Sequence, residues 1–285
     1  MSGAARIRAL LADGPVVVPG VYDGLSARLA VAAGAPVVFV SGFAVAAARL
    51  GLPDIGYLTP TEMAQTAREV CAAVPGVPVL VDADTGYGDA LSARRVAREL
   101  HAAGAAGLML EDQVWPKRCG HMDGKRVVEA GEWLAKLRAV RDLRDEGADL
   151  FLIARTDARA PLSLDEAIAR ARAAHDLGAD AVFVEAPADA GEMRRVTAGT
   201  PGAVRMANMV EGGRTPLMTP AELHDAGHDL VARPLTGLLA AARALAAAYG
   251  ALAGGPPGAP PGMLDFAAMT ALLDLEGHRR TGARY

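Results

Sequence analysis

One segment, residues 77–113, reads VPVLVDADTGYGDALSARRVARELHAAGAAGLMLEDQ. It begins with a short β-branched run at 77–82 and continues into a helical stretch at 90–103 that is rich in Ala, Leu and Arg. Gly104 follows the helical stretch, where glycine commonly ends a helix. A second apolar run occupies 107–111. This order of strand, helix and strand is typical of a βαβ unit, in which the two strands are parallel.

The same alternation recurs along the chain. We predict strands at 15–19, 36–41, 77–82, 107–111, 150–155, 181–185, 203–208 and 229–232. We predict helices at 23–33, 60–73, 90–103, 129–146, 164–177, 189–198, 219–226 and 235–250. Strand–helix units repeated over about 250 residues favour a (β/α)8 TIM-type barrel. An open doubly wound sheet is the alternative, but no glycine-rich phosphate-binding motif follows the first strand.

The end of the chain has a different composition. After residue 252 the sequence GGPPGAPPG is incompatible with the interior of a helix or a sheet. We therefore predict a catalytic barrel over 1–252, a Pro/Gly linker over 253–262, and a C-terminal helix with its tail over 263–285. The amphipathic helix itself is expected near 263–277. A helix on such a tether can pack on its own barrel or on a neighbouring subunit.

Composition limits the class of protein. Hydrophobic residues make up 52% and charged residues 22% of the chain, which excludes a disordered protein. The net charge is −4 and no basic block is present, so we expect no nucleic-acid and no membrane partner, although a small anionic substrate stays possible. Two cysteines, Cys71 and Cys119, form no disulfide framework, and the N-terminus lacks a signal peptide. The Ala-rich stretch 238–253 contains Arg243 and is interpreted as a packed helix. Together these features predict a cytoplasmic protein.

Acidic residues follow two neighbouring predicted strands. Asp82 and Asp84 close one strand and Glu111 closes the next. If the strand continues through Asp84, alternation directs both aspartates to the same side, at the barrel end where active sites form. Three carboxylates in one small volume repel one another unless a cation or protons neutralise them. We therefore predict a site for a hard divalent ion, Mg²⁺ or Mn²⁺. The alternative is that these acids cap the following helices.

A second polar cluster lies in the long loop after the fourth predicted strand. Its sequence is KRCGH over 117–121. Long loops in compact barrels are usually functional. Because Cys119 lies between cations, its thiol is expected to titrate below a free thiol and could serve as a proton donor or a nucleophile. The alternative is a surface loop with an incidental cysteine.

Several motifs together carry a family resemblance. They are Ser41-Gly42, DADTGYG (82–88), EDQ (111–113), PKRCGH (116–121), ARTDA (154–158), FVEAP (183–187) and ANMVEGGRTP (207–216). This combination resembles the isocitrate lyase/phosphoenolpyruvate mutase superfamily over nearly the whole chain. The resemblance implies a (β/α)8 barrel, dependence on Mg²⁺ (or Mn²⁺) and a 2-hydroxy or 2-oxo acid substrate. It also implies a homodimer or homotetramer that exchanges its C-terminal helices.

The resemblance further implies a role for each matching residue. The metal-site carboxylates would be Asp54, Asp82, Asp84 and Glu111, with Asp84 as the direct ligand and others acting through bound water. The catalytic residues would be Lys117, Cys119, His121, Arg155 and Glu185. The substrate-binding residues would be Ser41, Gly42, Phe43, Asp82, Gly120, Arg155, Asn208 and Arg233. Two of them, Phe43 and Arg233, depart from the family pattern. We expect Phe43 to narrow or re-line the pocket, and Arg233 either to meet an extra anionic group or to be an ordinary paired arginine.

The implied reaction is a reversible retro-aldol cleavage. A 2-hydroxy acid would give a 2-oxo acid and a carboxylate-stabilised carbanion, which the Cys119 thiol protonates. The chain resembles the short members of the superfamily, and MVEGG (209–213) and HMDGK (121–125) are closer to dimethylmalate lyase and phosphonomutase than to methylisocitrate lyase. A phosphonomutase that forms a P–C bond and an oxaloacetate-cleaving enzyme therefore stay as alternatives. A homologue that binds a small acid without turnover is a further one.

Overall fold

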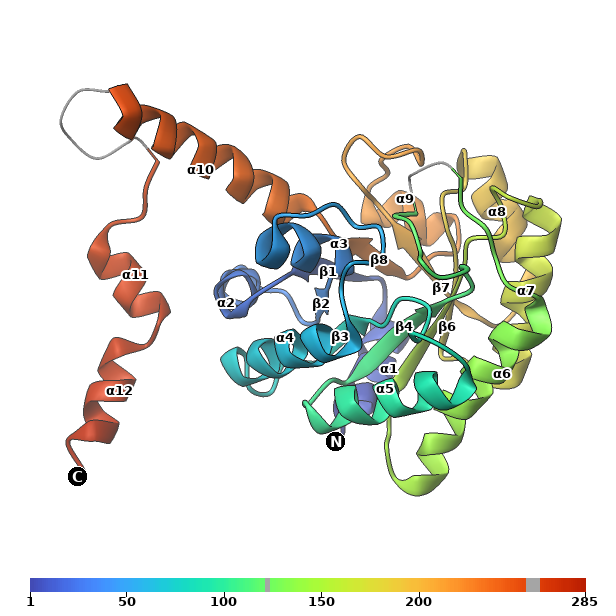
Figure 1. Cartoon of the computed structure of the whole chain (residues 1–285), viewed down its shortest axis with the longest axis horizontal. Coiled ribbons are helices and arrows are strands. Elements are labelled where there is room, and N and C mark those ends of the chain that lie inside the picture. The colour runs from blue at the N-terminus through green and yellow to red at the C-terminus, as the bar shows by residue number, and fades with distance from the viewer. Residues whose placement is uncertain (121–123, 255–261) are drawn as a thin grey trace. The chain divides into compact units, whose positions relative to one another are not determined.

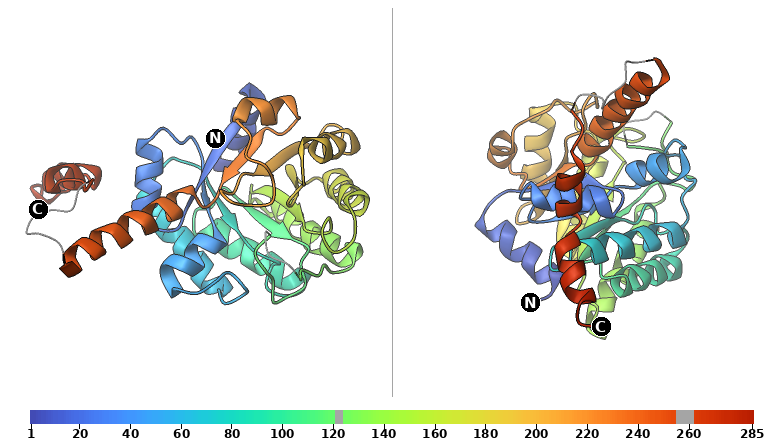
Figure 2. Two further views of the ribbon diagram at one scale, coloured as in Figure 1. Left: turned by 90° about the horizontal axis from the view of Figure 1, so that it is seen from above. Right: turned by 90° about the vertical axis from the view of Figure 1, so that its left-hand side faces the viewer.

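The computed structural model describes residues 1–120, 124–254 and 262–285. Its centre is a closed barrel of parallel strands in the order β1-β2-β3-β4-β5-β6-β7-β8. Helices surround these strands, as two perpendicular views show (Figures 1 and 2). The predicted (β/α)8 barrel is confirmed.

The strands are close to the predicted ones. They are β1 (Val16–Val21), β2 (Val38–Val40), β3 (Val79–Asp82), β4 (Gly107–Glu111), β5 (Phe151–Thr156), β6 (Ala181–Val184), β7 (Val204–Asn208) and β8 (Leu230–Arg233). β1 extends past its predicted end at residue 19, because Gly20 and Val21 pair with β2. β2 is shorter than predicted, since its pairing with β3 begins only at Val38.

The helices that follow the strands also match the prediction. They are α2 (Gly24–Ala32), α4 (Pro60–Ala73), α5 (Ala90–Ala102), α6 (Ala130–Arg141), α7 (Leu164–Leu177), α8 (Ala190–Gly199), α9 (Pro220–Asp225) and α10 (Thr236–Gly254). Local capping explains several starts: at α9, Thr219 accepts from the Glu222 N–H while the Glu222 carboxylate accepts from the Thr219 N–H. The predicted helix 129–146 is α6 followed by a 3₁₀ turn, η2 (Asp142–Glu146).

Apolar side chains fill two regions of the barrel. One lies between the strands and their helices. The other is the barrel interior, where Phe39, Met109 and Phe183 belong to one buried cluster. Ala4 and Ile7 of an additional helix, α1 (Gly3–Asp13), join this interior cluster. Three described elements lie outside the predicted ones: α1, and the α3 helix (Gly42–Val45) and π-helical turn η1 (Ala46–Leu50) that follow β2.

The chain forms two compact units, Met1–Leu238 and Leu239–Tyr285. The boundary falls earlier than the predicted one at 252, and α10, which runs across it, buries none of its residues. Part of the predicted linker, residues 255–261, lies outside the described residues. The C-terminal helix predicted near 263–277 is instead two short helices, α11 (Phe266–Leu272) and α12 (Leu275–Gly282). They are separate because Asp274 adopts a left-handed φ of 56° and caps α12 with its side chain.

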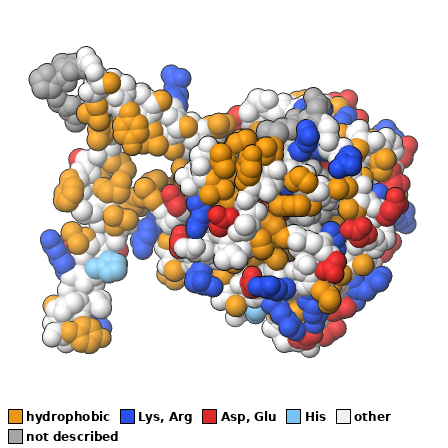
Figure 3. Space-filling view, viewed as in Figure 1, with side chains coloured by type: hydrophobic (Ala, Val, Ile, Leu, Met, Phe, Trp, Pro, Cys, Tyr) orange, Lys and Arg blue, Asp and Glu red, His pale blue; other side chains and the backbone are white. Residues whose placement is uncertain are grey.

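The second unit exposes many apolar side chains. Figure 3 shows hydrophobic atoms over much of this unit. The exposed large apolar residues of the unit include Leu245, Tyr249, Leu252 and Phe266. By length and composition, α10 is the one helix among the described residues that could cross a membrane, with a mean hydropathy of 1.4. Arg243 lies near its centre, where a charge in a bilayer costs about 2.5–3.5 kcal/mol. The interpretation of α10 as a packed helix therefore stays our prediction.

Candidate active site

The carboxyl ends of β3 and β4 bring the predicted acidic cluster together. Asp82 is the last residue of β3 and Glu111 the last of β4. Asp84 lies beyond β3 with a left-handed φ of 48°, and its backbone N–H donates to Asp82 Oδ1 at 3.1 Å. All three side chains are buried. The expectation that Asp82 and Asp84 share one side of a strand is therefore wrong, because a tight turn places Asp84 beside Asp82.

Lys117, from the loop after β4, extends its ammonium group among these carboxylates. Its Nζ lies 2.8 Å from Asp84 Oδ1 and 2.5 Å from Asp54 Oδ1, and all three side chains are buried. Burial lowers the pKa of Lys117, but Asp84 and Asp54 outweigh burial and hold this pKa well above its usual range. Lys117 therefore stays charged and neutralises part of the acidic cluster.

The remaining carboxylates resist ionisation. Burial, reinforced by the charge of Asp84, raises the pKa of Asp82 to about 6. Burial is also the main reason that the pKa of Glu111 lies well above its usual range and that the pKa of Asp54 is raised. Carboxylates with raised pKa values bind a further cation favourably, because the cation stabilises their charged form.

Arg155 leaves the end of β5 and is surrounded by acids. Its Nε lies 2.9 Å from Asp157 Oδ2 and 3.3 Å from Glu111 Oε2, and its Nη2 lies 3.4 Å from Glu185 Oε2. The guanidinium also lies 5.5 Å from the centre of the Phe183 ring. These contacts fix Arg155 in one orientation at the centre of the barrel mouth.

The loop after β4 is anchored against this arginine. Lys125 Nζ donates to the Gly120 carbonyl at 2.6 Å and lies 2.8 Å from Asp157 Oδ1. A Cβ atom on Gly120 would lie 2.5 Å from Arg155 Nη2 and from Glu185 Cδ. Glycine at position 120 therefore lets the loop backbone approach the two charged side chains directly.

Cys119 belongs to the same anchored loop. Its backbone N–H donates to the Asp54 carbonyl at 3.2 Å. The Gln113 side chain bonds both the N–H and the carbonyl of Arg118, at 3.0 and 2.8 Å. The other cysteine, Cys71, packs on the apolar layer around the barrel, where burial raises its pKa to about 11. Cys119 is thus the cysteine that the fold brings to the acidic cluster.

Tyr87 lies behind the metal-site candidate Asp84. Its hydroxyl donates to Asp84 Oδ2 at 2.6 Å, and its ring centre lies 5.4 Å from that of Trp115. Burial and the charge of Asp84 hold the pKa of Tyr87 well above its usual range. The phenol therefore stays protonated and remains a hydrogen-bond donor.

A cavity of about 50 Å³ opens at the centre of these groups. Its polar lining consists of Ser41, Asp54, Asp82, Lys117, Arg118, Cys119, Gly120, Arg155 and Asn208. Its apolar lining consists of Phe39, Phe43, Met109, Phe183, Met206, Val210, Ala232, Pro234 and Leu235. The charged lining residues come from the carboxyl ends of β3 and β5, from the loop after β4 and, for Asp54, from the segment after the helical turn η1. The carboxyl ends of β7 and β8 contribute uncharged side chains. The cavity therefore has a charged side and an apolar side.

Most of the predicted site residues meet here. Asp84, Glu111 and Glu185 lie just behind the lining, and Asn208 Nδ2 donates to Glu185 Oε2 at 3.3 Å. Gly42 lies against the cluster, since a Cβ there would be 2.9 Å from Asp82 Oδ2. His121 lies outside the described residues.

Among the predicted residues that the structure describes, Arg233 is the one that it does not bring to the cavity. Its Nη2 donates to the Met218 carbonyl at 3.2 Å, and its Nη1 is 4.0 Å from Glu211 Oε1. Side chains alternate along a strand, so Ala232 faces the cavity and Arg233 faces away from it. Of the two expectations for Arg233, the contacts agree with a paired arginine and not with a substrate ligand.

The donor set suits a hard divalent cation. Four buried carboxylates surround one small volume, and Glu111 Oε1 is buried without a hydrogen-bond partner among the described residues. No three acidic, histidine or cysteine side chains of the described residues converge on one point. Mg²⁺ does not require this, because it commonly keeps several waters and takes only one or two carboxylates directly. Asp84, with Asp82, Glu111 and Asp54 around it, would hold such an ion.

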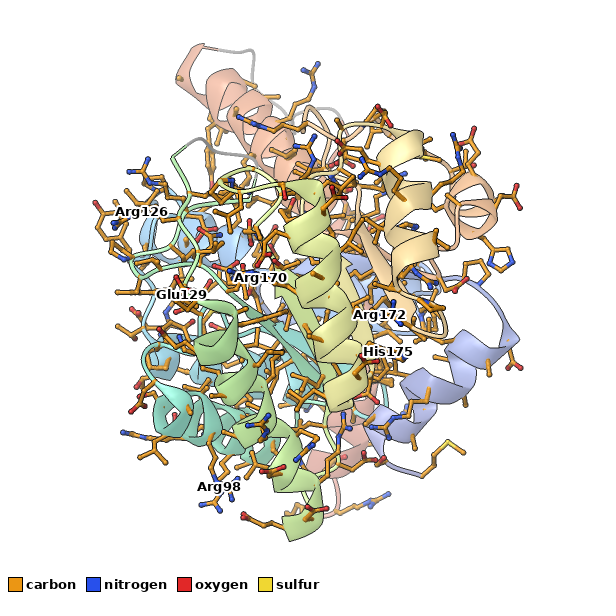
Figure 4. All side chains as sticks on the ribbon, turned by 90° about the vertical axis from the view of Figure 1, so that its right-hand side faces the viewer. Arg98, Arg126, Glu129, Arg170, Arg172 and His175 are labelled. Carbon is orange, nitrogen blue, oxygen red and sulfur yellow. The ribbon has the colours of Figure 1, made fainter. Side chains whose placement is uncertain are left out.

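Sequence reasoning missed a buried network that supports the site. Asp112 accepts from the Asp157 N–H at 2.8 Å and from Thr156 Oγ1 at 2.6 Å. Arg170 of α7, labelled in Figure 4, donates to Asp112 Oδ2 at 3.1 Å. Lys125 joins the same network through Asp157. The motifs EDQ, ARTDA and HMDGK contain most of these residues, but no sequence signal indicated the partner of each.

Comparisons with known proteins agree with this geometry. The family model for phosphoenolpyruvate phosphomutase matches residues 7–253. The chain is 53% identical over 232 residues to the petal death protein of Dianthus caryophyllus, covering 81% of this chain and 72% of that protein. It is 46% identical over 278 residues to the chloroplastic carboxyvinyl-carboxyphosphonate phosphorylmutase of Arabidopsis thaliana, covering 96% and 81%. It is 42% identical over 246 residues to the 2,3-dimethylmalate lyase of Eubacterium barkeri, covering 86% and 84%.

Solved structures show the same likeness. A structure of oxaloacetate acetylhydrolase in complex with the inhibitor 3,3-difluorooxalacetate matches with a TM-score of 0.93 at 35% identity, covering 99% of this chain and 97% of that one. A phosphonopyruvate hydrolase in complex with oxalate and Mg²⁺ matches with a TM-score of 0.86 at 25% identity, covering 100% and 99%. The likeness in sequence therefore covers up to 96% of this chain, and the likeness in fold covers at least 99% of it.

Proposed function

Because this chain belongs to the phosphoenolpyruvate mutase family, within the isocitrate lyase/phosphoenolpyruvate mutase superfamily, we propose that it is a Mg²⁺-dependent carbon–carbon lyase. The proposed reaction is the retro-aldol cleavage of a 2-hydroxy acid to a 2-oxo acid and a carboxylate. The observation that carries the proposal is the meeting of Cys119, Lys117 and Arg155 with the buried carboxylates around one small cavity.

The proposed chemistry divides among these groups. Mg²⁺, when bound beside Asp84, would act as a Lewis acid on the substrate's hydroxyl and carboxylate oxygens. Arg155, held by three acids, supplies preorganised positive charge for the anion that develops as the C–C bond breaks. Cys119 then donates its thiol proton to the carbanion, while the anchored loop limits access of water. The residue that removes the hydroxyl proton stays unassigned.

The shape of the cavity supports a compact substrate with an apolar substituent. A volume of about 50 Å³ corresponds to about three to five water-sized positions. Part of the lining is apolar and includes Phe43, Val210 and Leu235. A third carboxylate against these side chains would lose hydration without gaining a cation, so a tricarboxylate is disfavoured. We therefore favour a 2-alkylmalate over a methylisocitrate-like substrate.

A phosphonomutase reaction is the second candidate. It is favoured by the 46% identity, over 96% of this chain, to a carboxyvinyl-carboxyphosphonate phosphorylmutase. Oxaloacetate cleavage is favoured by the TM-score of 0.93 to oxaloacetate acetylhydrolase. Both reactions also involve small anions at a divalent ion, so the same cavity could accept either substrate.

The deciding experiment is an assay of the purified protein with Mg²⁺ and a panel of acids. The panel contains 2,3-dimethylmalate, 2-methylisocitrate, oxaloacetate and phosphonopyruvate, and the products are followed as 2-oxo acid release and by phosphorus NMR. Release of a 2-oxo acid from the alkylmalate, abolished by EDTA, is the expected result. Conversion of the phosphonate instead would assign the protein to the mutase reaction, and turnover unaffected by EDTA would refute the metal dependence.

The exposed apolar side chains of α10 and α11 support a homodimer or homotetramer in which these helices pack on a neighbouring subunit. We also propose a cytoplasmic location, because the two cysteines of the sequence are too few for a disulfide framework.

A further inference from the structure

The turn after β3 carries two residues in an unusual backbone conformation. Asp84 and Tyr87 have left-handed φ values of 48° and 58°, and neither is glycine. This conformation is unfavourable for an L-residue, because it brings the Cβ atom too close to the following carbonyl oxygen. Non-glycine residues persist in it where the surrounding structure requires them, and such positions concentrate at functional sites.

Tyr87 makes one polar contact and one aromatic contact. Its hydroxyl donates to Asp84 Oδ2 at 2.6 Å. Its ring meets Trp115 at 5.4 Å between ring centres, with planes tilted by 57°. Trp115 is two residues before Lys117, whose ammonium lies 2.8 Å from the other Asp84 oxygen, Oδ1. Asp84 is therefore held from the turn on one oxygen and from the loop on the other.

We propose that Tyr87 is the positioning residue of this site, because its hydroxyl orients Asp84 toward the metal ion. Through its ring, Tyr87 also makes the environment of Trp115 depend on whether the metal site is occupied. The inference rests on the metal dependence proposed above. A carboxylate that binds Mg²⁺ must present one oxygen to the ion, and a hydrogen bond to its second oxygen fixes the rotation of the carboxylate group. The Tyr87 hydroxyl makes this bond, while the ring of the same side chain contacts the loop that carries Cys119.

Substitution Tyr87→Phe tests the first part, because it removes the hydroxyl and retains the ring. Binding of Mn²⁺, as a paramagnetic substitute for Mg²⁺, is measured by EPR titration, which does not depend on turnover. Loss of a hydrogen bond to a metal ligand typically weakens metal affinity by about 10- to 100-fold, and we expect a loss in this range. Tyr57→Phe is the matched control, since it removes a phenol hydroxyl from an exposed position nearby in the chain and should leave Mn²⁺ affinity unchanged.

Trp115 fluorescence tests the link to the loop. The second tryptophan, Trp133, is fully buried and serves as a constant background, and Trp115→Phe identifies the Trp115 signal. Saturating Mg²⁺ is expected to change Trp115 emission in the wild type and in Tyr57→Phe. In Tyr87→Phe the change should be lost even at saturating Mg²⁺, although the ring still faces Trp115. An undiminished change in Tyr87→Phe would overturn the link.

The outcomes separate this inference from the proposed function. A wild-type protein that binds no Mn²⁺ would refute the proposed metal dependence, and the inference with it. A wild-type protein that binds Mn²⁺, with Tyr87→Phe binding it equally well, would overturn the role of Tyr87 alone. Equal thermal midpoints of wild type and Tyr87→Phe in EDTA would exclude a general loss of folding as the cause of weaker binding.

Discussion

The proposed reaction depends on individual side chains, and most directly on the Cys119 thiol that would protonate the carbanion. Substitution Cys119→Ser should lower turnover of the 2-hydroxy acid by about 10²- to 10⁴-fold, the range that a general acid contributes. The hydroxyl of serine is too weak an acid to replace the thiol, yet Mn²⁺ binding by EPR should persist because Cys119 is not a metal ligand. Cys71→Ser on α4 is the matched control. Full activity in Cys119→Ser would remove this cysteine from the mechanism.

Asp82 predicts a pH dependence of metal binding. Its folded pKa of about 6 lies above the ordinary value of 3.8 because burial disfavours the carboxylate. Below pH 6 the group is protonated, and a cation must displace the proton to bind. Mg²⁺ affinity by calorimetry should therefore fall by up to about tenfold per pH unit below 6 and level off above it. Asp82→Asn should flatten this profile, and an unchanged slope would contradict the assignment of the proton to Asp82.

From His228 we expect a second effect of acid, on the stability of the folded chain. It is buried beside the Ala226 carbonyl, and burial lowers its pKa from 6.5 to about 4. Between pH 6.5 and pH 4, this histidine binds a proton in the unfolded chain but not in the folded chain. The free energy of unfolding should thus fall by about 3 kcal/mol from pH 6.5 to pH 4, at ~1.36 kcal/mol per pKa unit.

Urea unfolding across this pH range provides the measurement. His228→Gln should reduce the loss of stability between pH 6.5 and 4, because glutamine takes up no proton. His101→Gln, at an exposed histidine, should leave the loss as it is in the wild type. Equal pH profiles in all three proteins would show that His228 does not contribute.

At the scale of elements, the loop after β4 depends on a buried ion pair. Lys125 bonds the Gly120 carbonyl and Asp157, and Asp157 in turn holds Arg155. Lys125→Met keeps the length of the side chain and removes the charge. We expect kcat to fall by about 10²-fold, since a small misplacement of reacting groups costs this much.

The measurement is steady-state kinetics combined with limited trypsin digestion. Cleavage near Arg118 should become faster in Lys125→Met, because the loop has lost its anchor to Asp157. Arg126→Met is the control, since it removes an exposed charge from the same loop. A reduced kcat without faster cleavage would argue against anchoring as the role of Lys125.

At the scale of the whole molecule, the exposed apolar face of α10 predicts assembly. Leu245 and Tyr249 are 50% and 65% exposed in the single chain. Burial of such side chains at an interface is worth about 25 cal/mol per Å² of apolar surface. Light scattering should therefore give two or four times the mass of one chain. Leu245→Asp together with Tyr249→Asp should reduce it toward the monomer mass.

The control for this prediction lies on the barrel. Leu162 is similarly exposed, at 55%, but it lies outside the C-terminal unit. Leu162→Asp should leave the measured mass unchanged. A monomeric wild type, or an assembly that tolerates both aspartates in α10, would refute the proposed interface.

The sequence by itself determined the barrel and the placement of its strand ends. Apolar runs separated by helices are local signals, since hydrophobic periodicity and glycine-terminated helices depend on near neighbours in the chain. Residues that end a strand, such as Asp82, Glu111 and Arg155, therefore reach one mouth of the barrel by topology alone. This is why the acidic cluster was predictable.

Only the tertiary structure decided which groups pair. Lys117 on Asp84, Arg170 on Asp112 and the Tyr87 hydroxyl behind Asp84 depend on loop paths and turn conformations. The contacts of Arg233 with the Met218 carbonyl and with Glu211 depend on the fold in the same way. No local pattern encodes such contacts, because each is selected by the packing of segments distant in the chain and by the cost of leaving a buried charge unpaired. The sequence thus assigned residues to the site, and the folded chain assigned their partners.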